Sequence, residues 1–194
     1  MLLHERLQGK QLILGSQSPR RQDYLRELNL SFEIQSPNSD ESFPDTLKGA
    51  AITDHIALEK AKAIILDNTL QIAITCDTIV WHENQALGKP KDHQEAFNML
   101  KSLSGKTHEV ISSVCLKSLE KTVVFHAVTA VTFTTLDEIT IDYYITNYKP
   151  FDKAGSYGIQ EWIGLVGIEE IKGSYSNVVG LPTEKLVKEL HAFL

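Results

Sequence analysis

Four segments of the chain combine charged, hydroxyl or amide side chains with turns or glycines, and the first of them has the features of a phosphate site. Ser16–Arg21 reads Ser-Gln-Ser-Pro-Arg-Arg, follows a short apolar run and begins a predicted helix. Backbone N–H groups at a helix start favour an anion. Two adjacent arginines add fork-shaped donors that match a phosphate group. The alternative is a capped surface helix with two solvated arginines.

The second segment places a carboxylate inside an apolar strand. Asp77 lies between Cys76 and Thr78 in the β-branched run 70–80. A buried carboxylate costs several kcal/mol unless it is paired or bound to a metal. Apolar neighbours on both sides make a solvated face the weaker interpretation, so Asp77 is a candidate for chemistry.

The third and fourth segments are glycine-containing turns with polar side chains. Leu87–Pro90 places Lys89 in a tight turn soon after the strand that carries Asp77. Asp152–Gln160 contains glycines that permit close backbone approach and polar groups that could bind the edge of a ligand. Taken alone, each is also compatible with an ordinary turn or loop.

Several other catalytic motifs are excluded. Ser104–Thr107 contains the Gly-Lys-Thr of a P-loop, but Leu100 stands where the first glycine is needed. The seven histidines show no metal-binding spacing, and neither a GxSxG nucleophile motif nor a GxGxxG dinucleotide motif is present in the sequence. The remaining arginines, lysines and carboxylates such as Glu41 and Asp77 suit a metal-assisted reaction at a phosphate.

The elements that must position these segments alternate between strands and helices, which favours an α/β or α+β fold. In the N-terminal half we expect strands at 11–15, 32–34 and 70–80, helices at 19–29 and 48–67, and a polar loop at 36–46. Further on we expect a helix after Pro90 that ends at Ser104–Gly105, and an antiparallel pair at 110–119 and 123–134. A helix from Asp137 or Thr140 toward Tyr148, a strand within 165–171 and a helix to Leu194 with Thr183 as N-cap complete the prediction.

Composition bounds the class of protein. The chain has 194 residues, 42% apolar and 23% charged, so it fits one large globular domain or two small lobes. A net charge of −6 argues against a nucleic-acid partner. Cys76 and Cys115 form no CxxC pair, and no run approaches the ~18 apolar residues of a membrane span. Residues 1–10 lack the apolar core of a signal peptide, so we expect a cytoplasmic protein that does not contact membranes.

The same segments resemble the Maf family of nucleoside triphosphate pyrophosphatases. The fourth segment divides into the blocks Asp152–Gly155 and Tyr157–Gln160, and further blocks in the family's order are Asp40-Glu41, Lys60-Ala61, Leu103–Gly105 with His108-x-Val110, and Gly173–Pro182. Nine such blocks in register from about residue 12 to residue 190 make the resemblance specific. It implies a mixed α/β fold with a long curved mixed sheet flanked by helices. It also implies two lobes around a central cleft, within a single domain over residues 1–194.

The resemblance also implies an activity: hydrolysis of a nucleoside triphosphate to the monophosphate and pyrophosphate, with Mg²⁺ or Mn²⁺. Asp77 matches the family's proton acceptor, and Arg20, Thr78 and Gln160 match its positions for substrate choice. Six residues match triphosphate- and metal-binding positions: Ser18, Arg21, Glu41, Lys60, Lys89 and Asp152. Of these, Glu41 and Asp152 join Asp77 as the predicted metal ligands. Arg-Arg, Asp-Thr and Ile-Gln at these places are typical of the subgroup that hydrolyses dTTP and UTP and limits incorporation of non-standard nucleotides.

The sequence departs from the family pattern at two positions. Cys76 stands where alanine is commoner, and Glu161 stands where glycine often follows the glutamine. Glu161 adds a negative charge beside the expected base pocket.

Two other functions remain open from sequence. One is a purine-selective inosine or xanthosine triphosphate pyrophosphatase, which Thr78 and Gln160 would distinguish. The other is a regulator of septum formation and division arrest that acts by binding a partner. A homodimer is expected from the resemblance alone.

Overall fold

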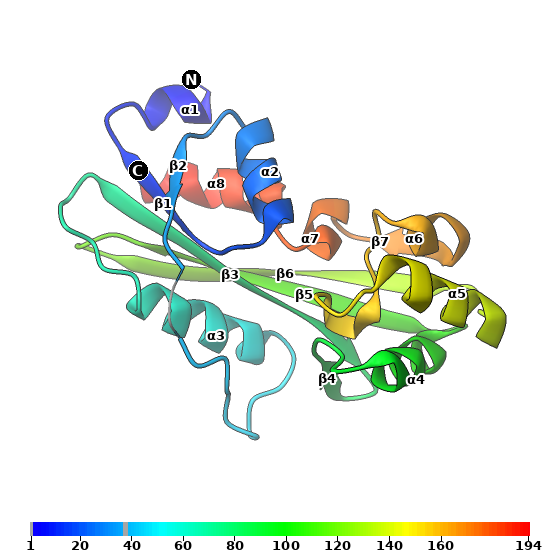
Figure 1. Ribbon diagram of the computed structural model, residues 1–194. Coiled ribbons are helices and arrows are strands. Elements are labelled where there is room, and N and C mark those ends of the chain that lie inside the picture. Colours follow the sequence, from blue (N-terminus) through cyan, green and yellow to red (C-terminus); the bar gives the residue numbers. More distant parts are fainter. Residues whose placement is uncertain (1, 37–38) are drawn as a thin grey trace. The chain divides into compact units, whose positions relative to one another are not determined.

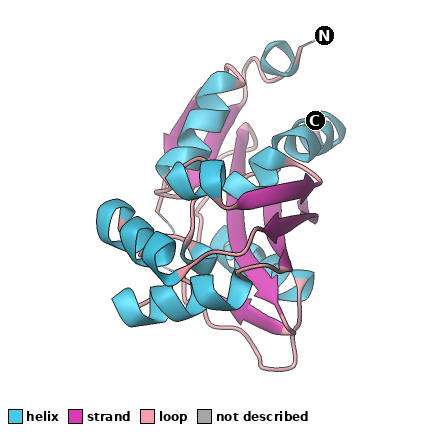
Figure 2. Ribbon diagram, turned by 90° about the vertical axis from the view of Figure 1, so that its right-hand side faces the viewer, coloured by secondary structure: helices cyan, strands magenta, loops and turns pink. Residues whose placement is uncertain are grey.

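The computed structural model describes residues 2–36 and 39–194. Its fold is mixed α/β, as predicted, with a mixed sheet flanked by helices (Figures 1 and 2). Across the described residues the sheet has seven strands in the order β2-β1-β3-β5-β6-β7, with β4 paired to β3. The strands are β1 (Gln11–Gly15), β2 (Phe32–Ile34), β3 (Gln71–His82), β4 (Gln85–Leu87), β5 (Thr107–Lys117), β6 (Thr122–Phe133) and β7 (Ile168–Lys172).

Helices separate most of these strands along the chain. They are α1 (Leu3–Arg6), α2 (Pro19–Glu27), α3 (Ala50–Lys62), α4 (His93–Leu103), α5 (Glu138–Tyr148), the 3₁₀ turn η1 (Ala154–Ser156), α6 (Trp162–Val166), α7 (Tyr175–Val179) and α8 (Thr183–Phe193). Within the described part of the chain, none of them combines the length and apolar character that crossing a membrane requires.

Side-chain caps explain where two of the helices begin. The Asp92 carboxylate accepts a hydrogen bond from the Glu95 N–H at 2.8 Å, and the Asp137 carboxylate accepts one from the Thr140 N–H at 2.7 Å. Gly105, with φ of +68°, follows α4 in the left-handed region that favours glycine. The N-cap at Asp137 and the stop at Gly105 confirm the sequence predictions for both helices.

The chain divides into two compact units. Unit 1 comprises Met1–Asp77, Ser112–Ala127 and Gly180–Leu194, and unit 2 comprises Thr78–Ile111 and Val128–Val179. Strands β3, β5 and β6 each contribute residues to both units. The boundary in β3 falls between Asp77 and Thr78, so these two candidate site residues belong to different units.

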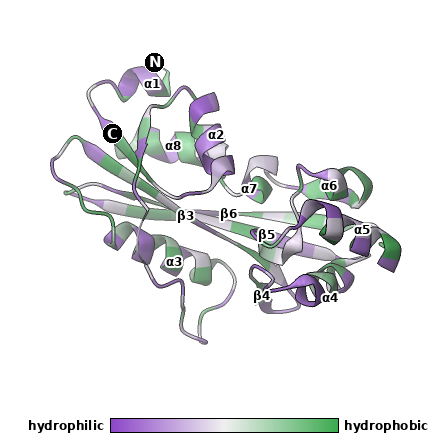
Figure 3. Ribbon diagram, viewed as in Figure 1, coloured by the Kyte–Doolittle hydropathy of each residue, from purple (hydrophilic) through white to green (hydrophobic). Residues whose placement is uncertain are grey.

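In unit 1 the two-residue period of β3 sends alternate side chains into two layers. Strand β1 runs parallel to both β2 and β3. Ile72 and Ile74 pack in one apolar core with Leu25 of α2 and Leu190 of α8. Figure 1 shows α2 and α8 on one side of β1, and α3 on the other. Helix α2 is predominantly hydrophilic in Figure 3, and its buried residue Leu25 holds it to this core.

The opposite side of β3 faces α3. Ala73 packs with Ile13 and Ile64, while Thr75 donates a hydrogen bond from Oγ1 to the carbonyl of Ala57 at 2.6 Å. Asp77 is the next residue in this alternation, so the fold directs its side chain to the same side as α3. Its backbone position is thereby set by the packing of its apolar neighbours.

Unit 2 has one apolar core of its own, formed by α4, α5, the sheet and the loop before α6. Leu100, Phe133, Ile141 and Ile159 belong to it. Helix α4 packs against α5 and η1. This core fixes the ends of the loop that carries Gln160.

Some predicted element bounds are wrong. The helix expected at 48–67 spans Ala50–Lys62, because the chain then turns to bury Ile64 while Ile65 is 73% exposed. The strand predicted within 165–171 is confirmed as β7, which begins at Ile168 after α6 has ended at Val166. Thr183 is the first residue of α8, and Pro182 occupies the N-cap.

The strand pair predicted at 110–119 and 123–134 is confirmed as β5 and β6. The pair β5–β6 forms a hairpin closed by a hydrogen bond from the Ser118 N–H to the Lys121 carbonyl at 2.9 Å. In the polar loop predicted at 36–46, Pro37 and Asn38 lie outside the described residues, as does Met1.

Candidate functional site

In unit 1, two carboxylates converge on one ammonium group. The Nζ atom of Lys60 lies 2.9 Å from Oδ1 of Asp77 and 2.9 Å from Oε1 of Glu41. The Lys60 and Asp77 side chains are only 10% and 12% exposed, whereas Glu41 is 58% exposed. Buried charges persist when they are paired in this way. The sequence predicted all three as site residues, and the structure brings them together.

Helix α3 is fixed at the turn that carries Lys60. The Thr75 bond to the Ala57 carbonyl ties it to β3 on one side. Lys117 of β5 donates from Nζ to the carbonyls of Ala61, at 2.9 Å, and Ile64, at 2.7 Å. Since Lys60 lies between these attachments, its ammonium group is held against Asp77.

Arg21 joins the first two segments that the sequence singles out. Its Nε donates to the Gly180 carbonyl at 2.9 Å, and its Nη1 donates to the Cys76 carbonyl at 3.0 Å and to Ser16 Oγ at 3.1 Å. The guanidinium group therefore connects the start of α2 to the residue before Asp77 and to the turn before α8. These contacts give Arg21 a structural role in unit 1, and its contact with a triphosphate stays a prediction.

The start of α2 differs from a simply capped surface helix. Ser18 occupies the N-cap position, but its side chain makes no capping hydrogen bond. The backbone N–H of Ser18 donates a hydrogen bond to Ser16 Oγ, at 3.2 Å. Ser18 and Arg20 are both half-buried.

In unit 2, the structure joins the third and fourth segments. The Gly155 N–H donates to the Gly88 carbonyl at 3.0 Å, which connects the turn of Lys89 to the loop 152–160. Gly155 has φ of +66°, and a Cβ there would lie 2.7 Å from a methyl of Val80. Glycine is therefore required at this position. Lys89, Asp152 and Gln160 are exposed, and Thr78 is half-buried.

A buried histidine anchors the loop at Tyr157. The Tyr157 hydroxyl lies 2.7 Å from Nε2 of His108, whose ring stacks on Phe133 with centroids 5.4 Å apart. Burial, with a smaller contribution from His82, lowers the pKa of His108 to about 3. His108 is therefore neutral at physiological pH, and it serves as a polar anchor rather than as a cation for phosphate.

The negative charge of Glu161 is compensated within unit 2. Its Oε1 lies 3.0 Å from Nζ of Lys153, and the Tyr144 hydroxyl donates a hydrogen bond to its Oε2. Lys153 Nζ also lies 2.7 Å from Oδ1 of Asp152. Sequence reasoning missed Tyr144 and Lys153, because no local pattern links residues 17 and 8 positions from Glu161 to it.

The donor chemistry of unit 1 fits a hard divalent cation. Within the described residues, no three or more His, Cys, Asp or Glu side chains are grouped so as to hold a metal ion. Mg²⁺ is usually held by one or two carboxylates together with substrate phosphates and water. Glu41 and Asp77, both within 2.9 Å of the same nitrogen, supply such a pair of carboxylates. Asp152, the third predicted ligand, lies in unit 2 beside Lys153.

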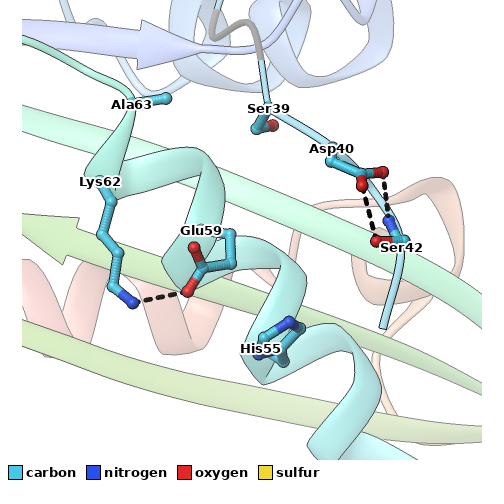
Figure 4. A pocket seen from close by; sticks show the side chains of 7 residues that line it. All are labelled: Ser39, Asp40, Ser42, His55, Glu59, Lys62 and Ala63. Atoms are coloured by element: carbon cyan, nitrogen blue, oxygen red, sulfur yellow. Dashed lines mark hydrogen bonds and ion pairs between the residues drawn. The ribbon is translucent and has the colours of Figure 1, made fainter. Parts of the chain in front are cut away.

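A polar hollow of about 600 Å³ lies elsewhere in unit 1, between the segment 39–42 and α3 (Figure 4). Its charged groups are paired locally: the Asp40 carboxylate accepts from Ser42 Oγ at 2.7 Å, and Lys62 Nζ lies 2.6 Å from Glu59. Among the described residues, its lining does not include Lys60 or Asp77. The hollow therefore borders the segment of Glu41, but its lining is made of other residues.

Comparison with known proteins identifies the family. The profile of the family described as "Maf-like protein" matches residues 11–193. The chain is 53% identical to a "dTTP/UTP pyrophosphatase" of Flavobacterium psychrophilum, over 95% of each chain. It is 50% identical to one of Christiangramia forsetii, over 100% of this chain and 99% of that one. The protein therefore belongs to the Maf-like family, which confirms the resemblance seen in its sequence.

A third relative and one solved structure also match the chain. A "dTTP/UTP pyrophosphatase" of Bacteroides fragilis is 52% identical over 92% of this chain and 94% of its own. Among solved structures, the Staphylococcus aureus Ham1 protein matches 64% of this chain and 72% of its own, with a TM-score of 0.45 and 11% identity.

Proposed function

We propose that this protein is a pyrophosphatase that hydrolyses dTTP and UTP to the monophosphate and pyrophosphate. Relatives that are 50–53% identical over nearly their whole length carry that name. The observation that carries the proposal is the convergence of Glu41, Lys60 and Asp77, which places paired carboxylates and a cation together in unit 1. A cytoplasmic location and a homodimer stay predictions of the sequence.

Asp77 is the proposed proton acceptor for the attacking water. Its Oδ1 is bonded to Lys60, which orients the carboxylate, and general-base catalysis by such a group contributes ~10²–10⁴-fold. Glu41 and Asp77 would hold Mg²⁺ or Mn²⁺, and Asp152 stays a ligand predicted from the sequence. When bound, the cation would stabilise negative charge on the phosphoryl oxygens.

The basic side chains are the proposed binding groups for the triphosphate. Ser18, Arg20 and Arg21 at the start of α2 provide hydroxyl and guanidinium donors, and Lys60 and Lys89 add ammonium groups. Such donors stabilise charge that moves onto a leaving pyrophosphate. Attack at the α-phosphorus follows, because the outer two phosphates would be the part that these cations retain.

Gln160 is the residue proposed to recognise the base of the nucleotide substrate. Uracil and thymine share one edge, in which two carbonyl acceptors flank an N3–H donor. A glutamine amide offers both a donor and an acceptor, so it can bind N3–H and one carbonyl together. Thr78 is proposed to assist at this edge. Cytosine presents an amine and an unprotonated N3, so it would pair with this amide only if the amide turned over by about 180°.

We therefore expect selectivity for the two pyrimidine substrates. The kcat/KM values for UTP and dTTP should be similar and should exceed those for CTP, ATP and GTP by about tenfold or more, since sites that rely on hydrogen bonds discriminate strongly. Gln160→Glu removes the amide donor and adds a charge, so it should lower kcat/KM for UTP more than for GTP. Pyrophosphate release from a panel of triphosphates measures both effects.

Gln94→Glu is the matched control, because Gln94 is an exposed glutamine of the same unit and lies on α4. It should leave the UTP:GTP ratio unchanged. Wild-type values for purine and pyrimidine triphosphates within about threefold of each other would reject the proposed substrate. An unchanged ratio in Gln160→Glu would remove Gln160 from base selection.

A further inference from the structure

The loop that carries Gln160 is anchored on both sides of that residue by groups with no assigned role in the reaction. Gln160 itself is exposed, whereas the three residues before it, Tyr157–Ile159, are buried. Tyr157 is bonded to His108, and Ile159 lies in the apolar core of unit 2. The conformation at Gln160 is therefore set by its neighbours rather than by contacts of its own.

Tyr144 makes two of the bonds that define this loop. Its side chain is fully buried in α5, and its hydroxyl accepts a hydrogen bond from the Gly158 N–H at 3.0 Å. The same hydroxyl donates to Oε2 of Glu161. Gly158 and Glu161 lie on either side of Gln160 in the chain. One phenol oxygen therefore holds the backbone on both sides of the residue that is proposed to bind the base.

Glu161 completes the arrangement. Its second carboxylate oxygen is 3.0 Å from Lys153 Nζ, at the start of the same loop. The loop is thereby closed from residue 153 to residue 161. A Cβ at Gly158 would lie 2.9 Å from both Glu161 Cδ and Lys153 Cε, so these two side chains pack directly over the glycine.

We propose that Tyr144 and Glu161 are positioning residues for base selection: through their hydrogen bonds to Gly158 and Lys153 they hold the loop in the conformation that presents the Gln160 amide. This inference rests on the proposed function, because it assigns the two residues to the selectivity attributed to Gln160. Buried polar groups that satisfy one another rigidify the segment that they join. In this arrangement the carboxylate acts through its bonds, and its charge is offset by Lys153.

The experiment measures kcat/KM for UTP, CTP and GTP in three loop variants. Tyr144→Phe removes the shared hydroxyl and should lower the UTP:CTP and UTP:GTP ratios by about tenfold, the effect of losing a hydrogen bond to a charged group. Glu161→Ala should act similarly. Glu161→Gln keeps the shape and a hydrogen-bonding group for each partner, so it should retain the ratios within about threefold.

Tyr148→Phe is the matched control. Tyr148 lies one turn along α5 and stacks on Tyr144 with ring centroids 5.3 Å apart, so its variant removes one hydroxyl from the same helix. It should leave the ratios unchanged. Hydrogen exchange of the Gly158 amide provides a second readout, and it should be about tenfold faster in Tyr144→Phe but unchanged in Tyr148→Phe.

The outcomes separate the two claims. If the wild-type enzyme is selective but Tyr144→Phe leaves the UTP:CTP and UTP:GTP ratios unchanged, this inference is overturned and the proposed function is not. An equal loss of kcat/KM on all three substrates would have the same consequence. If Glu161→Gln loses as much selectivity as Glu161→Ala, the charge of Glu161, and not its hydrogen bonding, sets the selectivity. That result would also overturn the inference. A wild-type enzyme without selectivity would reject the proposed substrate and this inference with it.

Discussion

Asp77→Asn should lower kcat for UTP at least about a hundredfold while the protein remains folded. An asparagine amide cannot accept a proton at neutral pH, and loss of a general base costs ~10²–10⁴-fold in rate. Asn retains a side-chain oxygen that can accept the Lys60 hydrogen bond now made at 2.9 Å, so the packing between α3 and β3 should persist. Steady-state kinetics together with circular dichroism and a melting curve measure both halves of this expectation.

Asp23→Asn is the control for neutralising a carboxylate in unit 1. Asp23 pairs with Arg26 on the surface of α2 and is 62% exposed, so its variant should keep wild-type activity. An Asp77→Asn enzyme with more than about a tenth of the wild-type kcat would remove Asp77 from the mechanism, since general-base effects are not that small.

Removal of divalent cations should abolish activity on UTP. The carboxylates of Glu41 and Asp77 are oxygen ligands of the kind that bind Mg²⁺ reversibly, and EDTA competes for such a cation. We expect the rate of pyrophosphate release to fall to background in EDTA and to return when excess Mg²⁺ or Mn²⁺ is added.

EDTA that has been saturated with Mg²⁺ beforehand serves as the control and should leave the rate unchanged. This comparison separates chelation from any effect of EDTA on the protein itself. Full activity in metal-free buffer with EDTA would exclude the divalent cation from the proposed reaction.

The parts of the fold that sequence predicts are those with a strong periodicity. The β-branched run 70–80 corresponds to β3 at Gln71–His82, and the Asp137 N-cap and the Gly105 stop have the geometry expected of them. The short elements α6, β4 and α7 have three to five residues each, which is too few to show a period of 3.6 or 2. Tertiary packing decides their conformation.

The residues of the candidate site also fall into those that local sequence predicts and those that it does not. An aspartate in an apolar strand identifies Asp77 from local sequence, because burial of an isolated charge is costly. That Lys60 bonds to both Asp77 and Glu41 is a long-range fact that only the structure shows, although the sequence predicts all three as candidate site residues. The partnership of Tyr144 with Glu161 connects α5 to a loop residue 17 positions away, and it became visible only in the structure.

Hydrolysis of UTP in H₂¹⁸O with Mg²⁺ tests the central claim most directly, because it shows which bond the enzyme cleaves and where water attacks. The products, analysed by mass spectrometry, should be UMP that carries one ¹⁸O atom and pyrophosphate without label. Unlabelled UMP with labelled pyrophosphate would place the attack at the β-phosphorus. UDP with labelled orthophosphate as the main products would show cleavage of the terminal phosphate, and either result would contradict the proposed pyrophosphatase mechanism.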